Sequence, residues 1–343
     1  MFKRKGLIAI IAVFALVAAA CGSSSDGGSD ESAGEIGLVF DIGGRGDQSF
    51  NDSAAAGIER AADELNINFN EAAANLDGSN REELLALQSE EHELVFGVGF
   101  LFDVPMAAVA AANPDTNYAI VDGFIADAPA NVVMLGFAEH EGSYLVGVAA
   151  ALKSTNGHVG FIGGVQIPLI EKFQAGFEAG VASVDASIVV NVQYLTLPPD
   201  FSGFNDPAAG KVVGQAMYEG GADVVYHAAG GSGGGLFQAA KEYAEANDTH
   251  VWAIGVDSDQ YLTAGDAAPY ILTSMLKRVD VAVYETIAAQ IAGEFAGGFS
   301  TFNVANGGID YSTSGGFVDD ISDELEAARA GILDGSITVP EAP

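Results

Sequence analysis

The sequence predicts an α/β protein with two doubly wound parallel-sheet lobes of similar size. Short apolar runs alternate with longer amphipathic stretches, as in βα units that build parallel sheets. The chain that follows the N-terminal leader is also longer than a typical single domain. Strands are expected at residues 36–41, 94–97, 117–121, 132–136, 157–162, 187–192, 223–228, 250–256 and 270–274, and helices at residues 53–65, 142–153, 170–183, 208–219, 236–247, 278–293 and 322–332.

The first residues have the pattern of an export signal. Lys3, Arg4 and Lys5 precede an apolar run over residues 6–17, which is too short to span a membrane alone. Ala18-Ala19-Ala20 then precedes Cys21, the single cysteine of the chain, and resembles the lipobox of bacterial lipoproteins. Residues 1–20 are therefore predicted to be a signal peptide and Cys21 a lipid anchor. Because Ala18 stands where lipoboxes usually have leucine, cleavage by ordinary signal peptidase stays an alternative.

A tether and two lobes are expected after the signal. Residues 21–35 are rich in Gly, Ser, Asp and Glu and cannot bury enough apolar surface to order, so we expect a flexible, lipid-anchored tether. We expect residues 36–137 with about 258–293 to form the N-terminal lobe, and residues 138–257 with about 294–343 the C-terminal lobe. Parallel sheets bind ligands beyond the carboxyl ends of their strands, so a cleft between the two lobes is the expected site.

Charge narrows the choice of partners. The formal net charge is −34, and loss of the leader with its three basic residues leaves −37 and ten Lys and Arg. Such a chain is unsuited to binding nucleic acid, anionic lipid surfaces or polyphosphates. A solvated acidic coat accounts for most of the acidic residues. From the predicted signal peptide and anchor, we expect the protein to lie on the outer face of the cell membrane, held there by the lipid on Cys21.

Six segments of the chain carry motifs in a fixed order. Asp41 ends the first strand, and a glycine-containing loop leads from it to Asp47-Gln48-Ser49-Phe50-Asn51. The other segments, in chain order, are FAEHEGSYLVG at 137–147, GGVQIPLIEKFQAGF at 163–177, HAAGGSG at 227–233, IGVDSD at 254–259 and SMLKR at 274–278. Together these segments resemble the basic membrane protein family, also called PnrA-like purine nucleoside receptors, whose first motif is similar to the arrangement after Asp41.

The resemblance implies a fold, a ligand and a partner. The fold is the type I periplasmic-binding-protein fold, with two doubly wound lobes joined by a multi-strand hinge. The ligand is a purine nucleoside of the adenosine, guanosine or inosine class, and the partner is an ABC transporter permease. We expect a monomer that captures the nucleoside between its lobes. The residues do not exclude pyrimidines, because stacking tolerates every base.

A purine could be held between aromatic side chains of the two lobes. Phe50 and Phe173 stand where loops lead into helices, at the apparent strand ends of different lobes. Asp47 and Asn51 could bind the edge of the base, since a carboxylate accepts and an amide both donates and accepts. Both phenylalanines could instead be core residues, and Asp47 or Asn51 could instead cap the following helix. Asp41 either supports the loop or touches the ligand.

A ribose diol could be bound by carboxylates at strand ends. Asp257 ends one predicted strand and Asp122 closes another. Lys277 could donate to a ribose hydroxyl or hold Asp257 in place, with a purely structural salt bridge as the alternative. Gly230 begins a run of small residues whose backbone N–H groups can approach a ligand closely.

No catalytic, metal or cofactor pattern accompanies these residues. The five histidines lack metal-binding spacing, no G-x-S-x-G elbow occurs, and GGSGGG lacks the dinucleotide-binding register. We therefore expect a binding protein without enzymatic activity, metal or cofactor. A receptor of the same fold for a sugar or signalling molecule remains an alternative, as does a surface nucleoside hydrolase.

Overall fold

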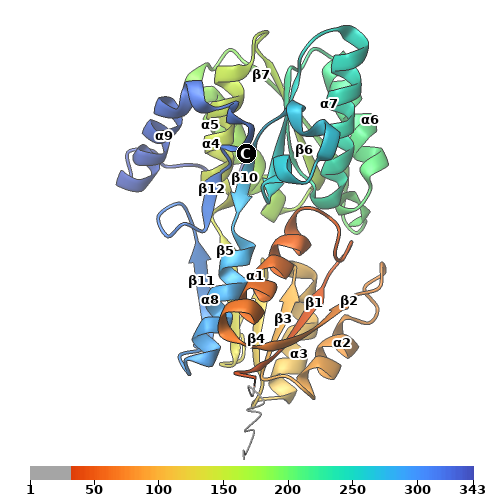
Figure 1. Cartoon of the computed structure of the whole chain (residues 1–343), viewed down its shortest axis with the longest axis vertical. Helices are drawn as coiled ribbons and strands as arrows, with labels where there is room; N and C mark the ends of the chain where they lie inside the picture. The colour runs from red at the N-terminus through yellow and green to blue at the C-terminus, as the bar shows by residue number, and fades with distance from the viewer. Residues whose placement is uncertain (1–31) are drawn as a thin grey trace, which may run out of the picture. The chain divides into compact units, whose positions relative to one another are not determined.

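The structure is a computed structural model that describes residues 32–343. Two six-stranded sheets with flanking helices build it (Figure 1). This confirms the predicted α/β class with two mostly parallel sheets. The predicted signal peptide, the anchor Cys21 and most of the predicted tether lie outside the described residues. None of the helices within residues 32–343 is long and apolar enough to cross a membrane.

The first sheet has the strand order β11-β5-β4-β3-β1-β2, and each of its pairings is parallel. On its flanks α1 packs against α8 and α2 against α3. We call this sheet with its helices the first lobe. Its elements are β1 Glu35–Phe40, α1 Phe50–Leu65, β2 Asn68–Ala73, α2 Arg81–Ser89, β3 Leu94–Val98, η1 Phe100–Phe102, α3 Asp103–Ala112, β4 Asn117–Val121, β5 Val132–Phe137, α8 Val279–Ile291 and β11 Gly298–Phe302.

The second sheet has the order β12-β10-β9-β8-β6-β7, with β12 antiparallel to β10. Here α4 packs against α5, α6 against α7, and α9 against α4. We call this sheet with its helices the second lobe. Its elements are α4 Glu139–Lys153, β6 His158–Val165, α5 Pro168–Val184, β7 Val189–Thr196, η2 Ser202–Phe204, α6 Pro207–Glu219, β8 Val224–Ala228, η3 Gly230–Ser232, α7 Gly233–Asn247, β9 Trp252–Asp257, η4 Gln260–Leu262, η5 Gly265–Tyr270, β10 Ile271–Lys277, β12 Ile309–Tyr311, η6 Ser314–Gly316, η7 Asp319–Ile321 and α9 Ser322–Asp334.

The chain crosses between the two sheets three times, after β5, after β10 and between β11 and β12. After residue 257, two strands belong to the other lobe from the one predicted. β10, expected in the N-terminal lobe, pairs with β9 in the second sheet, and β11, expected in the C-terminal lobe, pairs with β5 in the first. The reason is that β10 is almost wholly buried and needs a neighbour on each side, whereas β11 is a mostly exposed edge strand.

Glycines bring α4 and α5 into backbone contact. A Cβ at Gly176 would lie 2.1 Å from the carbonyl oxygen of His140, and one at Gly180 would lie 2.1 Å from that of Tyr144. Neither distance leaves room for a methyl group. The close packing fixes the start of α5, which carries Phe173, beside the start of α4.

Candidate functional site

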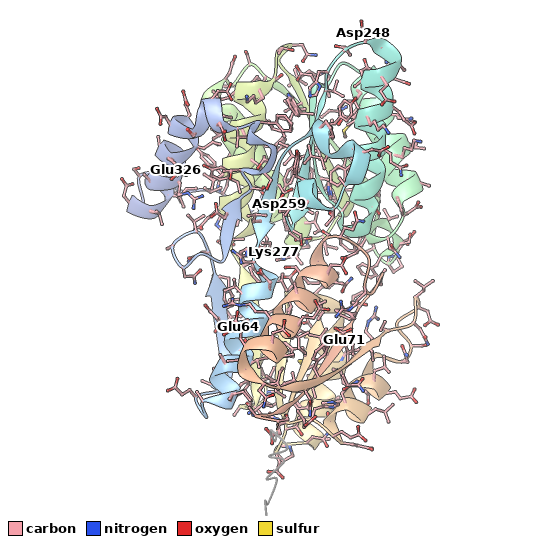
Figure 2. All side chains as sticks on the ribbon, in the orientation of Figure 1. Glu64, Glu71, Asp248, Asp259, Lys277 and Glu326 are labelled. Carbon is pink, nitrogen blue, oxygen red and sulfur yellow. The ribbon has the colours of Figure 1, made fainter. Side chains whose placement is uncertain are left out.

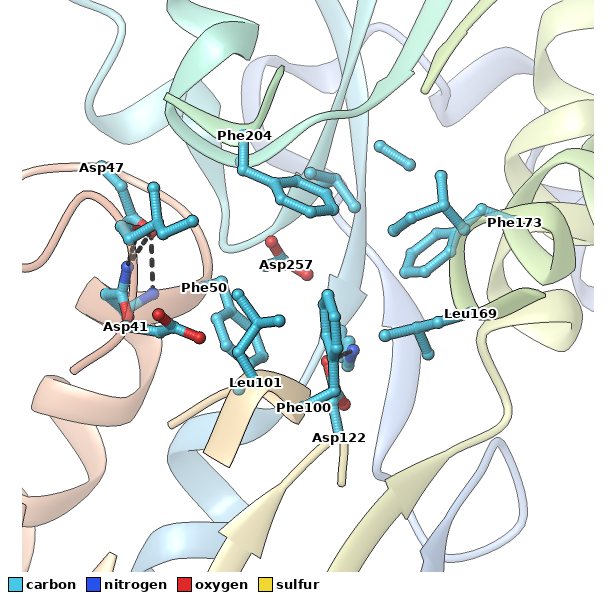
Figure 3. A pocket seen from close by; sticks show the side chains of 18 residues that line it. Asp41, Asp47, Phe50, Phe100, Leu101, Asp122, Leu169, Phe173, Phe204 and Asp257 are labelled. Atoms are coloured by element: carbon cyan, nitrogen blue, oxygen red, sulfur yellow. Dashed lines mark hydrogen bonds and ion pairs between the residues drawn. The ribbon is translucent and has the colours of Figure 1, made fainter. Parts of the chain in front are cut away.

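A pocket lies between the lobes, where the carboxyl ends of the strands of both sheets meet (Figure 3). The space between its lining atoms is about 700 Å³, which includes open solvent at the mouth. Each residue that the sequence analysis named as a candidate for ligand binding lines this pocket. These residues are Asp41, Asp47, Phe50, Asn51, Asp122, Phe173, Gly230, Asp257 and Lys277.

Asp47 caps helix α1. Its Oδ1 accepts hydrogen bonds from the backbone N–H groups of Ser49 (3.0 Å) and Asp52 (3.1 Å), and its Oδ2 accepts from the N–H of Asn51 (2.9 Å). The side-chain amide of Asn51 donates to the same Oδ2 at 3.1 Å. The carboxylate thus satisfies N–H groups that a helix start leaves free. Burial nevertheless raises the pKa of Asp47, with these hydrogen bonds opposing the rise.

Asn51 presents an acceptor at the pocket. Its Nδ2 donates to Asp47 and, at 3.2 Å, to the carbonyl oxygen of Ile42. Its Oδ1 is buried and has no hydrogen-bond partner among residues 32–343. A buried acceptor without a partner is unfavourable. A ligand N–H group could satisfy it.

Asp41 is ion-paired to a residue that the sequence analysis did not name. Arg81, at the start of α2, donates to Asp41 Oδ1 from Nε (3.0 Å) and Nη2 (2.6 Å). Burial raises the pKa of Asp41, and Arg81 opposes the rise. The pair ties the loop after β1 to α2, which fits the loop-supporting role rather than direct contact.

Lys277 forms a buried ion cluster where the two lobes meet (Figure 2). Its Nζ lies 2.5 Å from Asp122 Oδ2, at the end of β4, and 3.2 Å from Glu139 Oε1, at the start of α4. Burial alone would lower the pKa of Lys277, but Asp122, Glu139 and Asp257 raise it above its ordinary value. Because Asp122 belongs to the first lobe and Lys277 to the second, this ion pair joins the lobes.

Asp257 is held by a residue of the other lobe. Ser49 Oγ, in the loop before α1, donates to Asp257 Oδ2 at 2.5 Å. Burial raises the pKa of Asp257 to about 7, although Lys277 and the Ser49 hydroxyl oppose the rise. Asp122 and Asp257 both adopt left-handed backbone conformations, with φ of 63° and 64°. Non-glycine residues rarely do so, and such positions cluster at functional sites.

Aromatic rings from both lobes line the pocket. The ammonium of Lys277 is 5.2 Å from the ring centre of Phe50 and 5.5 Å from that of Phe173. Two further lining rings, Phe100 and Phe204, come from η1 and η2, and their centres are 6.4 Å apart. Figure 3 shows Phe204 reaching into the pocket from the lobe opposite Phe50 and Phe100.

Phe100, Phe204, Glu139 and Arg81 were not among the residues predicted from the sequence. Phe100 had a usable signal, because it follows Gly99 just beyond the predicted strand at 94–97. Phe204 follows a longer loop after an edge strand, and its distance from the strand end gives no such signal. Glu139 and Arg81 become functional candidates only through partners distant in the sequence.

Comparisons with known proteins agree on one kind of protein. A family model described as "ABC transporter substrate-binding protein PnrA-like" matches residues 35–342. The "ABC transporter nucleoside-binding protein BmpA" of Lactococcus lactis is 35% identical over 356 residues, covering 98% of this chain and 99% of that protein. An uncharacterized lipoprotein of Pyrococcus furiosus is 32% identical over 286 residues, covering 81% and 69%. The crystal structure of an ABC transporter solute-binding protein from Aeropyrum pernix superposes with a TM-score of 0.77 at 30% identity, covering 89% of this chain and 93% of that one.

Proposed function

The chain belongs to the family of PnrA-like ABC transporter substrate-binding proteins, and we propose that it captures a purine nucleoside between its lobes and delivers it to an ABC importer. Lipidated Cys21 would hold it on the outer face of the cell membrane, and the three crossovers between the sheets would act as the hinge. One observation carries the proposal. A single pocket combines aromatic rings from both lobes with two buried acceptor atoms, Asn51 Oδ1 and Asp122 Oδ1, that have no hydrogen-bond partner within residues 32–343.

The base is assigned to the aromatic part of the pocket. Phe50 and Phe100 line it from the first lobe, and Phe173 and Phe204 from the second. Stacking contributes on the order of 1–3 kcal/mol per base, and a flat heterocycle can stack on aromatic faces that line a cleft. The partnerless Oδ1 of Asn51 would accept an N–H group from the edge of the base.

The ribose is assigned to the carboxylates beside Lys277. Asp257 Oδ2 is already engaged by Ser49 and Asp122 Oδ2 by Lys277. Asp122 Oδ1 is buried without a hydrogen-bond partner in the described part of the chain, so it can accept from a sugar hydroxyl. Two strand-end carboxylates in one pocket suit a vicinal diol, which presents two hydroxyl donors.

The charge of the pocket favours a nucleoside over a nucleotide. Lys277 is the only Lys or Arg among the residues that line it, and two carboxylates already neutralise this ammonium. A phosphate would therefore meet Asp41, Asp47, Asp122 and Asp257 with no free cation to bind it.

Calorimetric titration with inosine, ribose and inosine monophosphate tests the proposal. We expect tight binding of inosine, and binding at least tenfold weaker for each of the other two, since ribose lacks the stacking surface and the monophosphate adds repulsion. Tight ribose binding without an inosine response would overturn the nucleoside assignment in favour of a sugar receptor. Multiple-turnover loss of the glycosidic bond of inosine would instead indicate a hydrolase.

A further inference from the structure

The lobes also touch through hydrogen bonds at the outer side of Asp257, in addition to the contacts that line the pocket. Ser258 Oγ, in the second lobe, donates to the carbonyl oxygen of Ser49 at 3.0 Å. Gln260 Nε2, in η4 of the same lobe, donates to the carbonyl oxygen of Gln48 at 3.0 Å. Both acceptors belong to the backbone of the loop before α1, in the first lobe. Neither Ser258 nor Gln260 lines the pocket.

The side chain of Gln260 is fixed before it meets the first lobe. It is 1% exposed, and its Oε1 accepts from the backbone N–H of Val256 at 2.8 Å and pairs with His227 Nε2 at 3.0 Å. Burial lowers the pKa of His227 to about 4, so the ring is neutral at pH 7, and its Nε2 carries the proton that faces Oε1. With Oε1 fixed in this way, the NH₂ group of Gln260 points at the carbonyl oxygen of Gln48.

Glycine-containing loops of the two lobes lie close together at the boundary. A Cβ at Gly231, in η3, would lie 3.5 Å from Asp47 Cβ of the opposite lobe, and one at Gly43 would lie 3.5 Å from Asn205 Cγ across the same boundary. Both distances correspond to ordinary van der Waals contact, so the two lobes are in contact here as well as at Ser258 and Gln260.

The contact also separates two spaces. Behind it lies a second hollow of about 800 Å³, partly open to solvent, whose lining includes Gln48, Ser258 and Arg278. Asp257 lines both this hollow and the pocket.

We propose that Ser258 and Gln260 form an interlobe latch on the backbone of Gln48 and Ser49, which stabilises the closed form without touching the ligand and sets how long the ligand stays bound. The proposal rests on the proposed function for the identity of the ligand. In this proposal Ser258 and Gln260 hold the two lobes together and do not contact the ligand. His227 orients the side-chain amide of Gln260.

Ligand dissociation is the first test. Ser258→Ala removes one donor, and Gln260→Glu replaces the NH₂ donor by a carboxylate oxygen that faces a carbonyl oxygen. We expect each change to speed inosine dissociation about tenfold in a stopped-flow chase, because a partly buried hydrogen bond across the boundary is lost. Association rates should change much less.

Matched controls separate the latch from general effects. Ser183→Ala removes a hydroxyl that donates to the carbonyl oxygen of Gly180 within the second lobe. Gln290→Glu makes the same charge change as Gln260→Glu while keeping the Oε1 acceptor for Asn117. Both controls should dissociate inosine at the wild-type rate. Equal rates for all four variants would overturn the latch.

A distance measurement decides the latch without reference to any ligand. Val104, on α3, and Val212, on α6, are 81% and 65% exposed and can carry spin labels after replacement by cysteine in the full-length Cys21→Ser chain. Without ligand, Ser258→Ala and Gln260→Glu should shift the distance distribution to longer values than in the parent chain. Unchanged distributions would contradict the latch. If the parent chain does not respond to inosine, the proposed function fails, while the comparison of variants without ligand still decides the latch.

Discussion

At the scale of single residues, the site is built from buried charges that are only partly compensated. Asp122 and Asp257 each commit one oxygen to a protein donor, and Lys277 is shared between Asp122 and Glu139. Burial of carboxylates is unfavourable unless hydrogen bonds compensate for the lost hydration. The proposed ligand would relieve this cost by donating hydrogen bonds to the carboxylates.

Asp257 gives nucleoside binding a pH dependence. Because its pKa is raised to about 7 by burial, a proton competes with a ligand that donates to the carboxylate. Inosine affinity should therefore fall as pH is lowered through 7, by at most roughly tenfold per pH unit. Calorimetry between pH 6.5 and 8.5 in buffers of different ionisation enthalpy measures both the affinity and the proton released on binding. Asp257→Asn should bind more weakly and lose the dependence; a wild-type affinity that is constant over this range would contradict the assignment.

Lys277 is predicted to be essential to stability as well as to the site. Lys277→Met leaves Asp122 buried without its cation and Glu139 with only Lys172, 3.7 Å away, and the loss of one partner from a buried ion pair destabilises by about 3–5 kcal/mol. Urea unfolding should show this loss. Lys211→Met, which breaks an exposed pair with Glu242, should change the unfolding free energy by less than about 1 kcal/mol. Equal effects of the two substitutions would contradict this account of the cluster.

At the scale of elements, the sequence predicts strand and helix positions well where apolar periodicity is strong. Every strand and helix that we expected overlaps an observed one. The elements that escaped prediction are β2, β11, β12, α2 and α3. β2 (NFNEAA) is polar, β11 is mostly exposed, and β12 has three residues, so none has a clear alternation of apolar and polar positions. For the two helices we identified no apolar stripe, since α2 buries only Leu85 and Gln88 and α3 is apolar on most faces.

The candidate site could also be predicted from the positions of the strands. Its acidic residues stand at the ends of strands, and parallel strands end at a common edge, so strand positions place them together. What the sequence could not give is how each side chain divides its hydrogen bonds. Capping stood only as an alternative for Asp47, and the structure shows that both its oxygens cap α1. The lobes to which β10 and β11 belong were also not predicted, because they depend on which sheet offers each strand a neighbour.

The contact between α4 and α5 gives a prediction at the element scale. Gly180→Ala places a methyl group 2.1 Å from the carbonyl oxygen of Tyr144, so we expect a loss of about 1–3 kcal/mol in unfolding free energy despite the better helix propensity of alanine. Gly234→Ala, in the first turn of α7, meets no atom within 4 Å and should be neutral or slightly stabilising. Chemical denaturation of both variants measures the difference. If Gly180→Ala were as stable as Gly234→Ala, the close packing of these helices would be refuted.

At the scale of the whole molecule, the dominant feature is uncompensated negative charge. The formal net charge is −34. Within residues 32–343 every Lys and Arg is already ion-paired to a carboxylate, and most acidic residues have no cation. The paired basic residues are Arg45, Arg60, Arg81, Lys153, Lys172, Lys211, Lys241, Lys277, Arg278 and Arg329.

Salt should therefore stabilise the folded protein. Screening weakens the repulsion among the acidic residues, and this gain exceeds the small loss from exposed ion pairs. We expect the thermal unfolding midpoint to rise between about 0.05 M and 1 M salt, with NaCl and KCl giving the same increase. A midpoint that falls over this range would show that the ion pairs, rather than the repulsion, dominate.

The central claim is that the whole molecule closes its lobes on a purine nucleoside. Native mass spectrometry of protein purified without refolding tests this claim most directly, because a ligand held between closed lobes can survive purification. The account predicts that the protein carries one additional mass, equal to that of a purine nucleoside, and that this mass is lost on unfolding. A retained sugar, nucleotide or other compound in its place would contradict the account.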